Sequence, residues 1–481
     1  MTHIAGIFTN FWFILFLLAV YAFVTISACI VVLSENRSPI RSLAWVIALI
    51  FLPGIGLIFY LFFGRSLKSL NLLYRHNKRK ILRLQKRNLR PLDSTNLSKS
   101  HKQLVKLSHS LTHANLTLHN DLQIFTSGKE KFLALIRDLE QARESIYLQY
   151  YIFNDDDIGT RIADILIRKA REGLDVKVLY DHVGSFSASN SFFKQMKNNG
   201  VLVKPFFRVT FPQLANRINW RNHRKLVIID NNIGYLGGMN IADRYARDTG
   251  DPDSWRDTHF RIQGEIIPQL TASFALDWNF LLKKPVEFPL RTPKYIPDAY
   301  LPMQFISSSP TEPWDNMSLI FLKAIASAKK SIYIQTPYFL PTDALLHALE
   351  AAALALVDVR IMIPAKPDSR LIRHASFSYI SQCIRAGIKV YLYTPGMIHA
   401  KAIIIDDDFV TAGSTNFDFR SLENNFECNL LIYSPQANAE MKRIFFRDRE
   451  SCIKLTASTW QKRPLFNRTL ESIIRLFAPI L

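Results

Sequence analysis

Two segments of the chain repeat one sparse pattern of reactive side chains, in which histidine, lysine and aspartate stand at fixed spacing. The residues that fit it are His223, Lys225 and Asp230 in the first copy and His399, Lys401 and Asp406 in the second. Glycine and asparagine follow at matching distances in both copies, as Gly237 with Asn240 and Gly413 with Asn416. In a chain of average composition, the number of such motifs expected by chance is on the order of a few hundredths. Two copies with matching downstream residues therefore indicate one phosphate-handling site built from two related halves.

These side chains are the ones that the exchange of a phosphodiester requires. One neutral imidazole can attack phosphorus and form a phosphohistidine, while the other, protonated, donates to the leaving oxygen and later deprotonates the incoming alcohol. Lys225 and Lys401 can stabilise charge on the nonbridging oxygens, and Asn240 and Asn416 can add amide donors. The sequence has no evident cluster of carboxylates suited to Mg²⁺ or Ca²⁺, so we predict a reaction without metal or cofactor. The residues alone leave open which histidine attacks.

Two acids lie at comparable distances downstream of the motifs, Asp257 and Glu427. A catalytic histidine usually has its second nitrogen oriented by an acceptor, so we expect each acid to hold the imidazole of the opposite half. The alternative for these acids is a surface salt bridge with Arg256 or Arg420. Asp230 and Asp406, which complete the motifs, close their predicted strands and are expected to fix a loop or pair with a lysine.

Each motif belongs to a longer repeated unit. Residues 142–149 parallel residues 328–335, and each segment follows a stretch with helical spacing and precedes a second helix and another strand. This alternation predicts an α/β fold with mixed or parallel sheets flanked by helices. We expect two lobes, residues 116–295 and 296–481, that are related by a pseudo-twofold axis and packed face to face.

The motifs fall on β-branched runs, residues 225–229 and 401–405, that are predicted to be strands. Residues two apart in a strand share a face, so the histidine and lysine of each copy should project together. The sequence therefore predicts that both pairs face the cleft between the lobes, with Arg224 and Ala400 pointing away.

Residues 1–65 are predicted to form a transmembrane helical hairpin. Residues 11–33 and 43–63 are uncharged apolar runs, and each is long enough to cross a membrane as a helix. Residues 66–115 are expected to be a basic juxtamembrane segment, which either binds anionic headgroups or only sets topology, followed by a polar linker. Because the basic residues follow the second run, the positive-inside rule predicts a multi-pass protein of the cell (inner) membrane with its catalytic lobes in the cytoplasm.

The composition favours an anionic partner. The net charge is +20, from 60 Lys and Arg against 40 Asp and Glu, which fits nucleic acid or an acidic membrane surface. Four cysteines stand without metal-ligand spacing and are interpreted as buried, reduced thiols: Cys29, Cys383, Cys428 and Cys452.

The two motifs with their surroundings resemble the phospholipase D superfamily, and more closely the bacterial cardiolipin synthases. The similarity includes residues 219–225 with 237–240, residues 395–401 with 413–416, the hairpin ending at residues 63–65, and the closing residues 475–481. The resemblance implies transfer of a phosphatidyl group from one phosphatidylglycerol to another, which yields cardiolipin and glycerol. It also implies that His223 is the nucleophile and His399 the acid and base. Leu422 and Asn424 depart from the family pattern and affect local packing rather than the chemistry.

Other activities share these residues. A phospholipase D-type hydrolase, or a phosphatidyltransferase that uses serine or ethanolamine, would differ only in which hydroxyl reaches the phosphohistidine. A nuclease or phosphodiesterase suits the charge, but the predicted hairpin argues against a nucleic acid partner and for phosphatidylglycerol and anionic lipids. Two intact motifs argue against a non-catalytic scaffold. The oligomeric state stays open, as does the role of the tail from Leu465, either a membrane contact or an ordinary docking helix.

Overall fold

The structure, a computed structural model, describes residues 2–34, 39–52, 54–60, 64, 95–209, 219–247, 251 and 253–478. Most of the predicted basic juxtamembrane segment lies in residues 65–94, outside the described residues. The chain divides into two compact units, one of Met1–Leu67 with Val209–Asn219 and one of Lys68–Arg208 with Trp220–Leu481. Each unit is described by itself.

The described residues of the N-terminal unit include the helices α1 (Thr2–Ser34), α2 (Pro39–Phe51) and α3 (Ile55–Phe59). Within α1, Phe11–Ser34 has a mean hydropathy of 2.7 and is long enough to cross a membrane. The chain then returns on itself, because Tyr21 Oη donates to the carbonyl of Leu49 at 2.8 Å. A small buried cluster joins the helices: Ala28, Val32, Leu49 and Tyr60.

The second predicted span, residues 43–63, is divided between α2 and α3 rather than continuous. Gly54 between them has a φ of 74°, and this left-handed conformation interrupts a right-handed helix. Residues 61–63 lie outside the described residues. Among the described residues, one helix therefore has the length of a membrane span.

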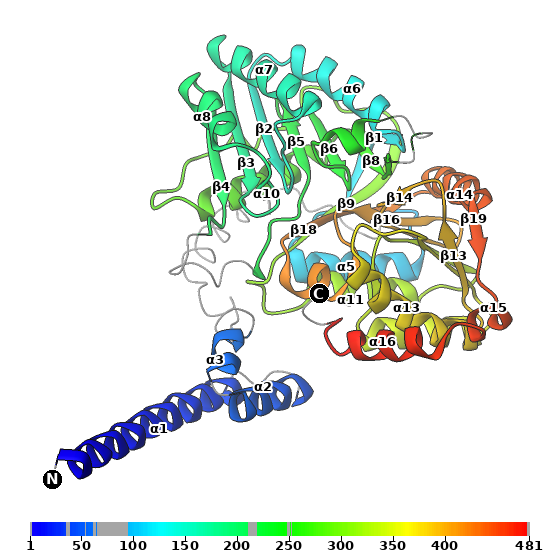
Figure 1. The fold of residues 1–481 in the computed structure, drawn as a ribbon. Helices are drawn as coiled ribbons and strands as arrows, with labels where there is room; N and C mark the ends of the chain where they lie inside the picture. Colours follow the sequence, from blue (N-terminus) through cyan, green and yellow to red (C-terminus); the bar gives the residue numbers. More distant parts are fainter. Residues whose placement is uncertain are drawn as a thin grey trace. The chain divides into compact units, whose positions relative to one another are not determined.

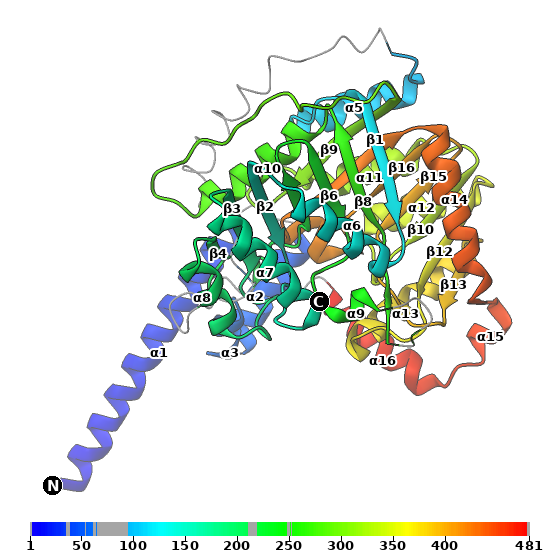
Figure 2. The same ribbon diagram turned by 90° about the horizontal axis from the view of Figure 1, so that it is seen from above.

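The larger unit is built on one sheet of 15 strands (Figures 1 and 2). Each lobe contributes seven strands, and corresponding strands follow in the same order outward from the junction of the lobes. In the first lobe these are β1 (Thr117–Phe125), β8 (His259–Gly264), β6 (Ile233–Gly237), β5 (Leu226–Ile229), β2 (Ser145–Tyr150), β3 (Asp175–Asp181) and β4 (Leu202–Phe206). In the second they are β9 (Tyr300–Ser308), β18 (Glu427–Tyr433), β16 (Phe409–Gly413), β15 (Ala402–Ile405), β10 (Ser331–Gln335), β12 (Asp358–Pro364) and β13 (Lys389–Tyr393), with β19 (Cys452–Lys454) added at the edge.

Helices flank both halves of the sheet. The first lobe has α6 (Gly128–Glu140), α7 (Asp157–Arg171), α8 (Asn190–Asn198), α9 (Asp243–Ala246) and α10 (Ile267–Phe280). The second has α11 (Asn316–Ala326), α12 (Asp343–Leu354), α13 (Arg370–Arg385), the π-helix η6 (Arg420–Asn424), α14 (Pro435–Glu450), α15 (Ala457–Gln461) and α16 (Leu465–Arg475). Four short strands form two further pairs: β7 (Trp255–Arg256) with β14 (Met397–Ile398), and β11 (Phe339–Leu340) with β17 (Phe417–Asp418).

The predicted pair of α/β lobes with mixed sheets is confirmed, but the lobes share a sheet instead of packing two sheets face to face. Strands β2, β3 and β4 are parallel, as are β10, β12 and β13, and the remaining neighbours are antiparallel. The lobes join where β1 pairs with β9 in the antiparallel sense. This pairing gives each edge strand a partner for its backbone groups, which would otherwise need water or another chain.

The expected linker before the first lobe is also more ordered than its polar composition suggests. Residues 99–112 form helix α5 (Lys99–Thr112), whose N-terminus is capped by Ser98. Its apolar side chains Leu104 and Val105 enter the core of the second lobe. The composition of this segment does not predict the helix, because only a narrow stripe of its surface is apolar.

The two glycines that follow the motifs lie where strands approach closely. A Cβ atom at Gly237 would lie 2.5 Å from Cα of His259, and one at Gly413 would lie 2.2 Å from the carbonyl oxygen of Cys428. Side chains at these positions would push β6 away from β8, or β16 away from β18. The thiols of Cys383 and Cys428 are free and buried as expected, whereas Cys29 and Cys452 are free and partly exposed.

Candidate active site

The two motif histidines lie just before β5 and β15, where strands of opposite lobes meet. The backbone N–H of His223 donates to the carbonyl of Phe426 at 2.9 Å, and the N–H of His399 donates to the carbonyl of Arg256 at 2.7 Å. Each acceptor immediately precedes one of the two predicted orienting acids. The same backbone contact thus occurs twice, once on each side of the pseudo-twofold axis.

Glu427 of the second lobe holds the imidazole of His223. Nδ1 of His223 lies 3.0 and 3.1 Å from the two carboxylate oxygens and 3.1 Å from the carbonyl of Ser414. Because all three neighbours are acceptors, Nδ1 carries the proton and Nε2 keeps its lone pair. Glu427 is held in turn by the hydroxyl of Ser414 at 2.5 Å and the amide of Asn425 at 3.2 Å.

Asp257 of the first lobe holds the imidazole of His399 in the reciprocal manner. Its Oδ2 atom lies 2.6 Å from Nδ1 of His399 and 3.5 Å from Nζ of Lys401. The backbone N–H of Thr258 donates to the other carboxylate oxygen at 2.7 Å. The expected crossing of the acids to the opposite lobes is therefore present for both histidines.

Both motif lysines are buried beside their histidines. Nζ of Lys225 donates to the carbonyl of His223 at 2.6 Å and lies 5.3 Å from the ring centre of Tyr151. Nζ of Lys401 contacts the carbonyl of His399 and lies 2.6 Å from its Nδ1 atom. The two ammonium groups thus converge on the histidine pair, as the strand alternation predicted.

The two motif asparagines have different surroundings. Asn240 accepts from the N–H of Ile152 at 3.1 Å and donates to the hydroxyl of Tyr245 at 2.8 Å. That hydroxyl lies 3.4 Å from Nδ1 of His399, so Asn240 reaches the histidine through Tyr245. Asn416 interacts with the carboxyl group of Asp418, whose pKa is raised by burial against the opposing effect of this contact.

The structure does not bring the motif aspartates to the histidines. Asp230 accepts from the backbone N–H groups of residues 143, 144 and 145 at 2.7 to 2.9 Å. Asp406 accepts from those of residues 329, 330 and 331 at 2.7 to 3.1 Å. The four residues of β15 separate Asp406 from the histidine end of the strand, about 13 Å at the usual rise. Both aspartates fix a loop, and both have a positive φ.

Each half of the site has a buried arginine beside it. The two arginines do not occupy equivalent positions of the repeated unit. Arg224 lies 2.5 Å from Asp277 in its own lobe, and Arg256 lies 2.6 Å from Asp448 in the opposite lobe. The matching positions of the second lobe hold uncharged residues, Ala400 and Phe426. Arg256 therefore adds an ion pair that ties the lobes together directly behind Asp257.

Aromatic side chains enclose both imidazoles, and sequence reasoning did not find them. The ring centre of Tyr151 lies 4.9 Å from that of His223, and those of Trp255 and Tyr245 lie 4.9 and 5.6 Å from that of His399. The sequence could have indicated Tyr151, because this residue lies two positions after Gln149, which ends the repeated segment. Nothing in the local sequence distinguished Tyr245 from a core tyrosine.

Burial governs the protonation of the histidines. It lowers the pKa of His223 to about 4, although the Glu427 carboxylate opposes this change. The pKa of His399 falls well below its usual value because of burial and the charges of Lys401 and Lys225. Burial tends to raise the pKa of Glu427, but His223 and Lys225 outweigh it and the net change is downward.

The pKa values of the two lysines lie near neutrality. Burial lowers the pKa of Lys225 to about 7 and that of Lys401 to about 8, against the opposing attraction of Glu427 and Asp257. An arriving phosphate would favour the charged forms of both lysines. No group of three or more His, Cys, Asp or Glu among the described residues is arranged to hold a metal ion.

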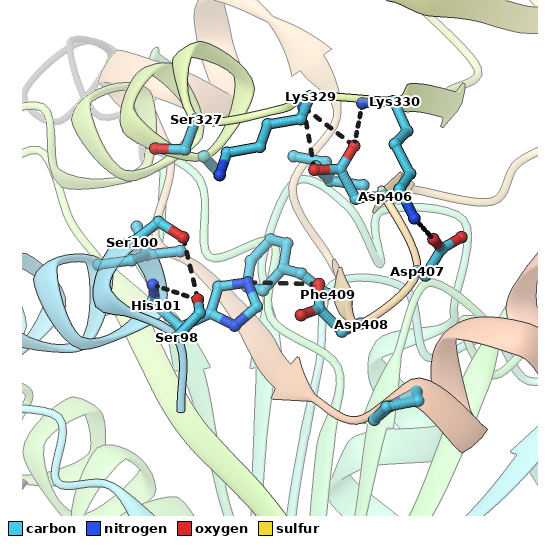
Figure 3. Close-up of a pocket in the computed structure, with 14 residues that line it drawn as sticks. Ser98, Ser100, His101, Ser327, Lys329, Lys330, Asp406, Asp407, Asp408 and Phe409 are labelled. Carbon is cyan, nitrogen blue, oxygen red and sulfur yellow. Dashed lines mark hydrogen bonds and ion pairs between the residues drawn. The ribbon is translucent and has the colours of Figure 1, made fainter. Parts of the chain in front are cut away.

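A pocket of about 410 Å³ opens at the other end of β15, beside residues 406–409 and the start of α5 (Figure 3). His101 and Asp408 face each other across it, with His101 Nε2 3.6 Å from Asp408 Oδ1. The backbone contacts that hold Asp406 form part of its wall. Neither motif histidine lines this pocket, so it is separate from the candidate site.

Comparison with known families identifies both parts of the chain. Residues 135–278 and 321–449 match the family described as "Cardiolipin synthase, PLD-like domain". Residues 12–65 match the family described as "Phospholipase_D-nuclease N-terminal". These matches include both motifs and the two apolar runs.

Curated relatives are similar over almost the whole chain. The cardiolipin synthase of Listeria monocytogenes serotype 4b (strain F2365) is 38% identical over 465 residues, which cover 94% of this chain and 96% of the relative. The major cardiolipin synthase ClsA of Bacillus subtilis (strain 168) is 39% identical over 464 residues, with the same coverage of 94% and 96%. Among solved structures, the phosphatidylserine synthase of Haemophilus influenzae Rd KW20 has a TM-score of 0.60 and 17% identity, covering 79% of this chain and 100% of that one. This last likeness concerns the fold.

Proposed function

The chain belongs to the cardiolipin synthase family of the phospholipase D superfamily, and from this premise we propose that it condenses two phosphatidylglycerol molecules to cardiolipin and glycerol. The observation that carries the proposal is the pair of buried imidazoles, each oriented by an acid of the opposite lobe. Two-step transfer needs such a pair, because one group must attack phosphorus while the other handles the proton of the alcohol.

In the first step, Nε2 of His223 attacks the phosphorus of one phosphatidylglycerol. The N–P bond forms as the bond from phosphorus to the headgroup glycerol oxygen breaks, and protonated His399 delivers its proton to that oxygen. Glycerol leaves, and a phosphatidyl group stays on His223. The Nδ1 proton donated to Glu427 and Ser414 supports this role, because it leaves the lone pair on Nε2.

In the second step, neutral His399 takes the proton from a hydroxyl of a second phosphatidylglycerol. The resulting oxygen attacks phosphorus, the N–P bond breaks, and cardiolipin forms. Lys225 and Lys401 stabilise the charge on the nonbridging oxygens in both steps. An anionic phosphate beside His399 opposes the effect of burial and raises the pKa of the imidazole, which allows it to carry a proton when substrate is bound.

The two acids suit different roles. The pKa of Glu427 is lowered overall, so it stays ionised and keeps the proton on Nδ1 of His223. The pKa of Asp257 is raised, chiefly by burial and against the attraction of Lys401. The assignment of His223 as the nucleophile and His399 as the acid and base rests on the Nδ1 proton that Glu427 and Ser414 hold on His223.

The apolar α1 helix supports a membrane setting for this reaction. Its segment Phe11–Ser34 is uncharged, and most of its large side chains are exposed. Together with the second apolar run, it would anchor the chain as a multi-pass protein of the cell (inner) membrane, and the basic residues that follow would keep the lobes in the cytoplasm. Lipid substrates held in the same membrane would then reach the site by lateral diffusion.

The test is a product assay with the full-length chain in membranes supplied with labelled phosphatidylglycerol and a metal chelator. The expected products are cardiolipin and glycerol in equal amounts. Phosphatidic acid with glycerol as the products would instead identify a hydrolase and contradict the proposal. Substitution of either His223 or His399 by alanine should abolish turnover, whereas the same change at the exposed His347 should leave it unaltered.

A further inference from the structure

Helix α16 is apolar on two sides, although it can bury only one of them in the fold. Its inner side packs beside α13 (Figure 1), where Ile474 and the following Ala478 join the core of the second lobe. The guanidinium of Arg475 lies 4.2 Å from the ring centre of Tyr379 on α13. Glu471 is buried on this side and pairs with Arg463 at 2.6 Å. These contacts fix which side of the helix faces outward.

Large apolar side chains occupy the outward side of α16 and the turn that follows it. The exposed fractions are 74% for Leu465, 75% for Phe466 and 51% for Ile473 in the helix, and 78% for Leu476 and 50% for Phe477 in the turn. At about 100° per residue, the three helical positions fall within about 100° of the helix circumference, and the two turn residues extend this exposed apolar patch. A helix that only docks on its own protein has a polar outer side, so this patch is unexplained by the fold.

The charges around the patch restrict what can cover it. Two basic residues, Lys462 and Arg463, precede the helix. Arg468 lies within it, and Arg475 ends it. The only acid between residues 462 and 478 is Glu471, which is buried and paired. An apolar strip bordered by basic side chains is the pattern of helices that lie in the interface of anionic bilayers. The net charge of +20 acts in the same direction.

We propose that the outer side of α16 inserts its apolar side chains into the surface of an anionic phospholipid bilayer. The catalytic unit then meets the membrane through its own C-terminal helix, in addition to the N-terminal apolar segment. This inference rests on the proposed function in one respect, the choice of phosphatidylglycerol as the anionic lipid, because that lipid is also the proposed substrate. Helices of this kind lie about 5–10 Å deep at the headgroup and acyl boundary.

The test uses the full-length chain in nanodiscs that contain phosphatidylcholine with phosphatidylglycerol. Spin labels are attached through Phe466→Cys or Phe477→Cys, after the partly exposed Cys29 and Cys452 have been replaced by serine. Ser472→Cys is the matched control, because Ser472 is exposed on the same helix but lies outside the apolar arc. Accessibility to oxygen, relative to a water-soluble nickel chelate, measures the contact of each label with lipid, and this readout does not depend on activity.

Labels at positions 466 and 477 should be several-fold more accessible to oxygen than to the chelate, while the label at 472 should show the reverse. Equal exposure of all three labels to the chelate would overturn the proposal. Dipolar coupling between labels on two chains would also overturn it, because a second copy would then cover the patch.

A functional comparison completes the test. The variant Phe466→Glu/Leu476→Glu should lose at least tenfold in cardiolipin formation in bilayers but retain turnover of detergent-dispersed short-chain phosphatidylglycerol. Leu354→Glu, which changes a leucine of α12 with an exposed fraction of 69%, should match the unaltered chain in both assays. Equal activity of the double variant and the control in bilayers would contradict the role of α16.

Discussion

Asp257 holds Nδ1 of His399 at 2.6 Å, although the two residues lie 142 positions apart and belong to different lobes. Glu427 and His223 form the reciprocal contact, so each lobe supplies a histidine to its own half and an acid to the other. Neither lobe therefore contains a complete half-site. An isolated lobe would keep its histidine and lysine but would lose the acid that orients the imidazole.

The acids should matter for the rate rather than for binding. Glu427→Gln and Asp257→Asn keep the shape of each side chain but remove the charge that fixes the histidine tautomer. We expect each to lower kcat by about 10²–10⁴-fold with little change in KM, by analogy with the loss of the orienting acid in a catalytic triad. Initial rates of cardiolipin formation measure this. Asp121→Asn, at an exposed position of β1, is the control, and a loss below tenfold in both site variants would argue against orientation by these acids.

The covalent intermediate should form on one histidine only. Rapid denaturation at alkaline pH during turnover, followed by proteolysis and mass spectrometry, should find the phosphatidyl group on the peptide that contains His223. His223→Ala should abolish the adduct, and unmodified His399 should be recovered throughout. An adduct on His399 would reverse the two assigned roles.

The pH dependence of kcat/KM should reflect the two lysines, since this ratio reports on the free enzyme. Lys225 and Lys401 have pKa values of about 7 and about 8, so each loses its positive charge as pH rises through its value. We expect kcat/KM to fall on the alkaline side as each lysine loses its charge, beyond the earlier fall that loss of the His399 proton causes at lower pH. The pKa of His223, about 4, keeps it neutral above pH 5, so it adds no acid limb there.

Lys225→Arg provides a direct check of this assignment. A guanidinium stays charged over the whole range, so the alkaline limb should move upward by at least half a pH unit even if the variant is slower. An alkaline limb at the same pH in the variant would show that Lys225 does not set it.

Asp406 should act on stability rather than on chemistry. Asp406→Ala removes a carboxylate that accepts three backbone N–H groups and places alanine at a φ of 49°. Charge-assisted hydrogen bonds and the left-handed backbone together suggest a loss of about 2–4 kcal/mol in the free energy of unfolding. Urea unfolding and the kcat of the folded fraction measure the two effects. A large fall in kcat without loss of stability would instead indicate a catalytic role for Asp406.

The repeated pattern predicts that the histidines, the lysines and two acids gather at one site, and the structure brings them together. This placement is predictable because strand alternation is local: a histidine and a lysine two residues apart share a face whatever surrounds them. The motif aspartates show the limit of the pattern. The fixed spacing marks Asp406 as part of the motif but does not show what it contacts. The pairing of β15 with β10 shows that its partners are backbone N–H groups at the far end of the strand.

The features that sequence reasoning missed depend on contacts between distant segments. Tyr245 reaches His399 because β7 of one lobe pairs with β14 of the other, which no local signal encodes. The sequence predicts a linker where α5 forms, because the helix is stabilised by packing on the second lobe rather than by its own composition. The shared sheet likewise follows from the pairing of β1 with β9, two strands 175 or more residues apart in the chain.

The covalent continuity of the two lobes has a consequence for how such a site can evolve. An assembly of identical subunits would carry every mutation twice, once on each side of its axis. In this chain a change alters one side only, and the two sides already differ: Gly238 stands opposite Ser414, Asp257 opposite Glu427, and Arg224 opposite Ala400. One covalent chain therefore permits the surroundings of each imidazole to change independently of the other.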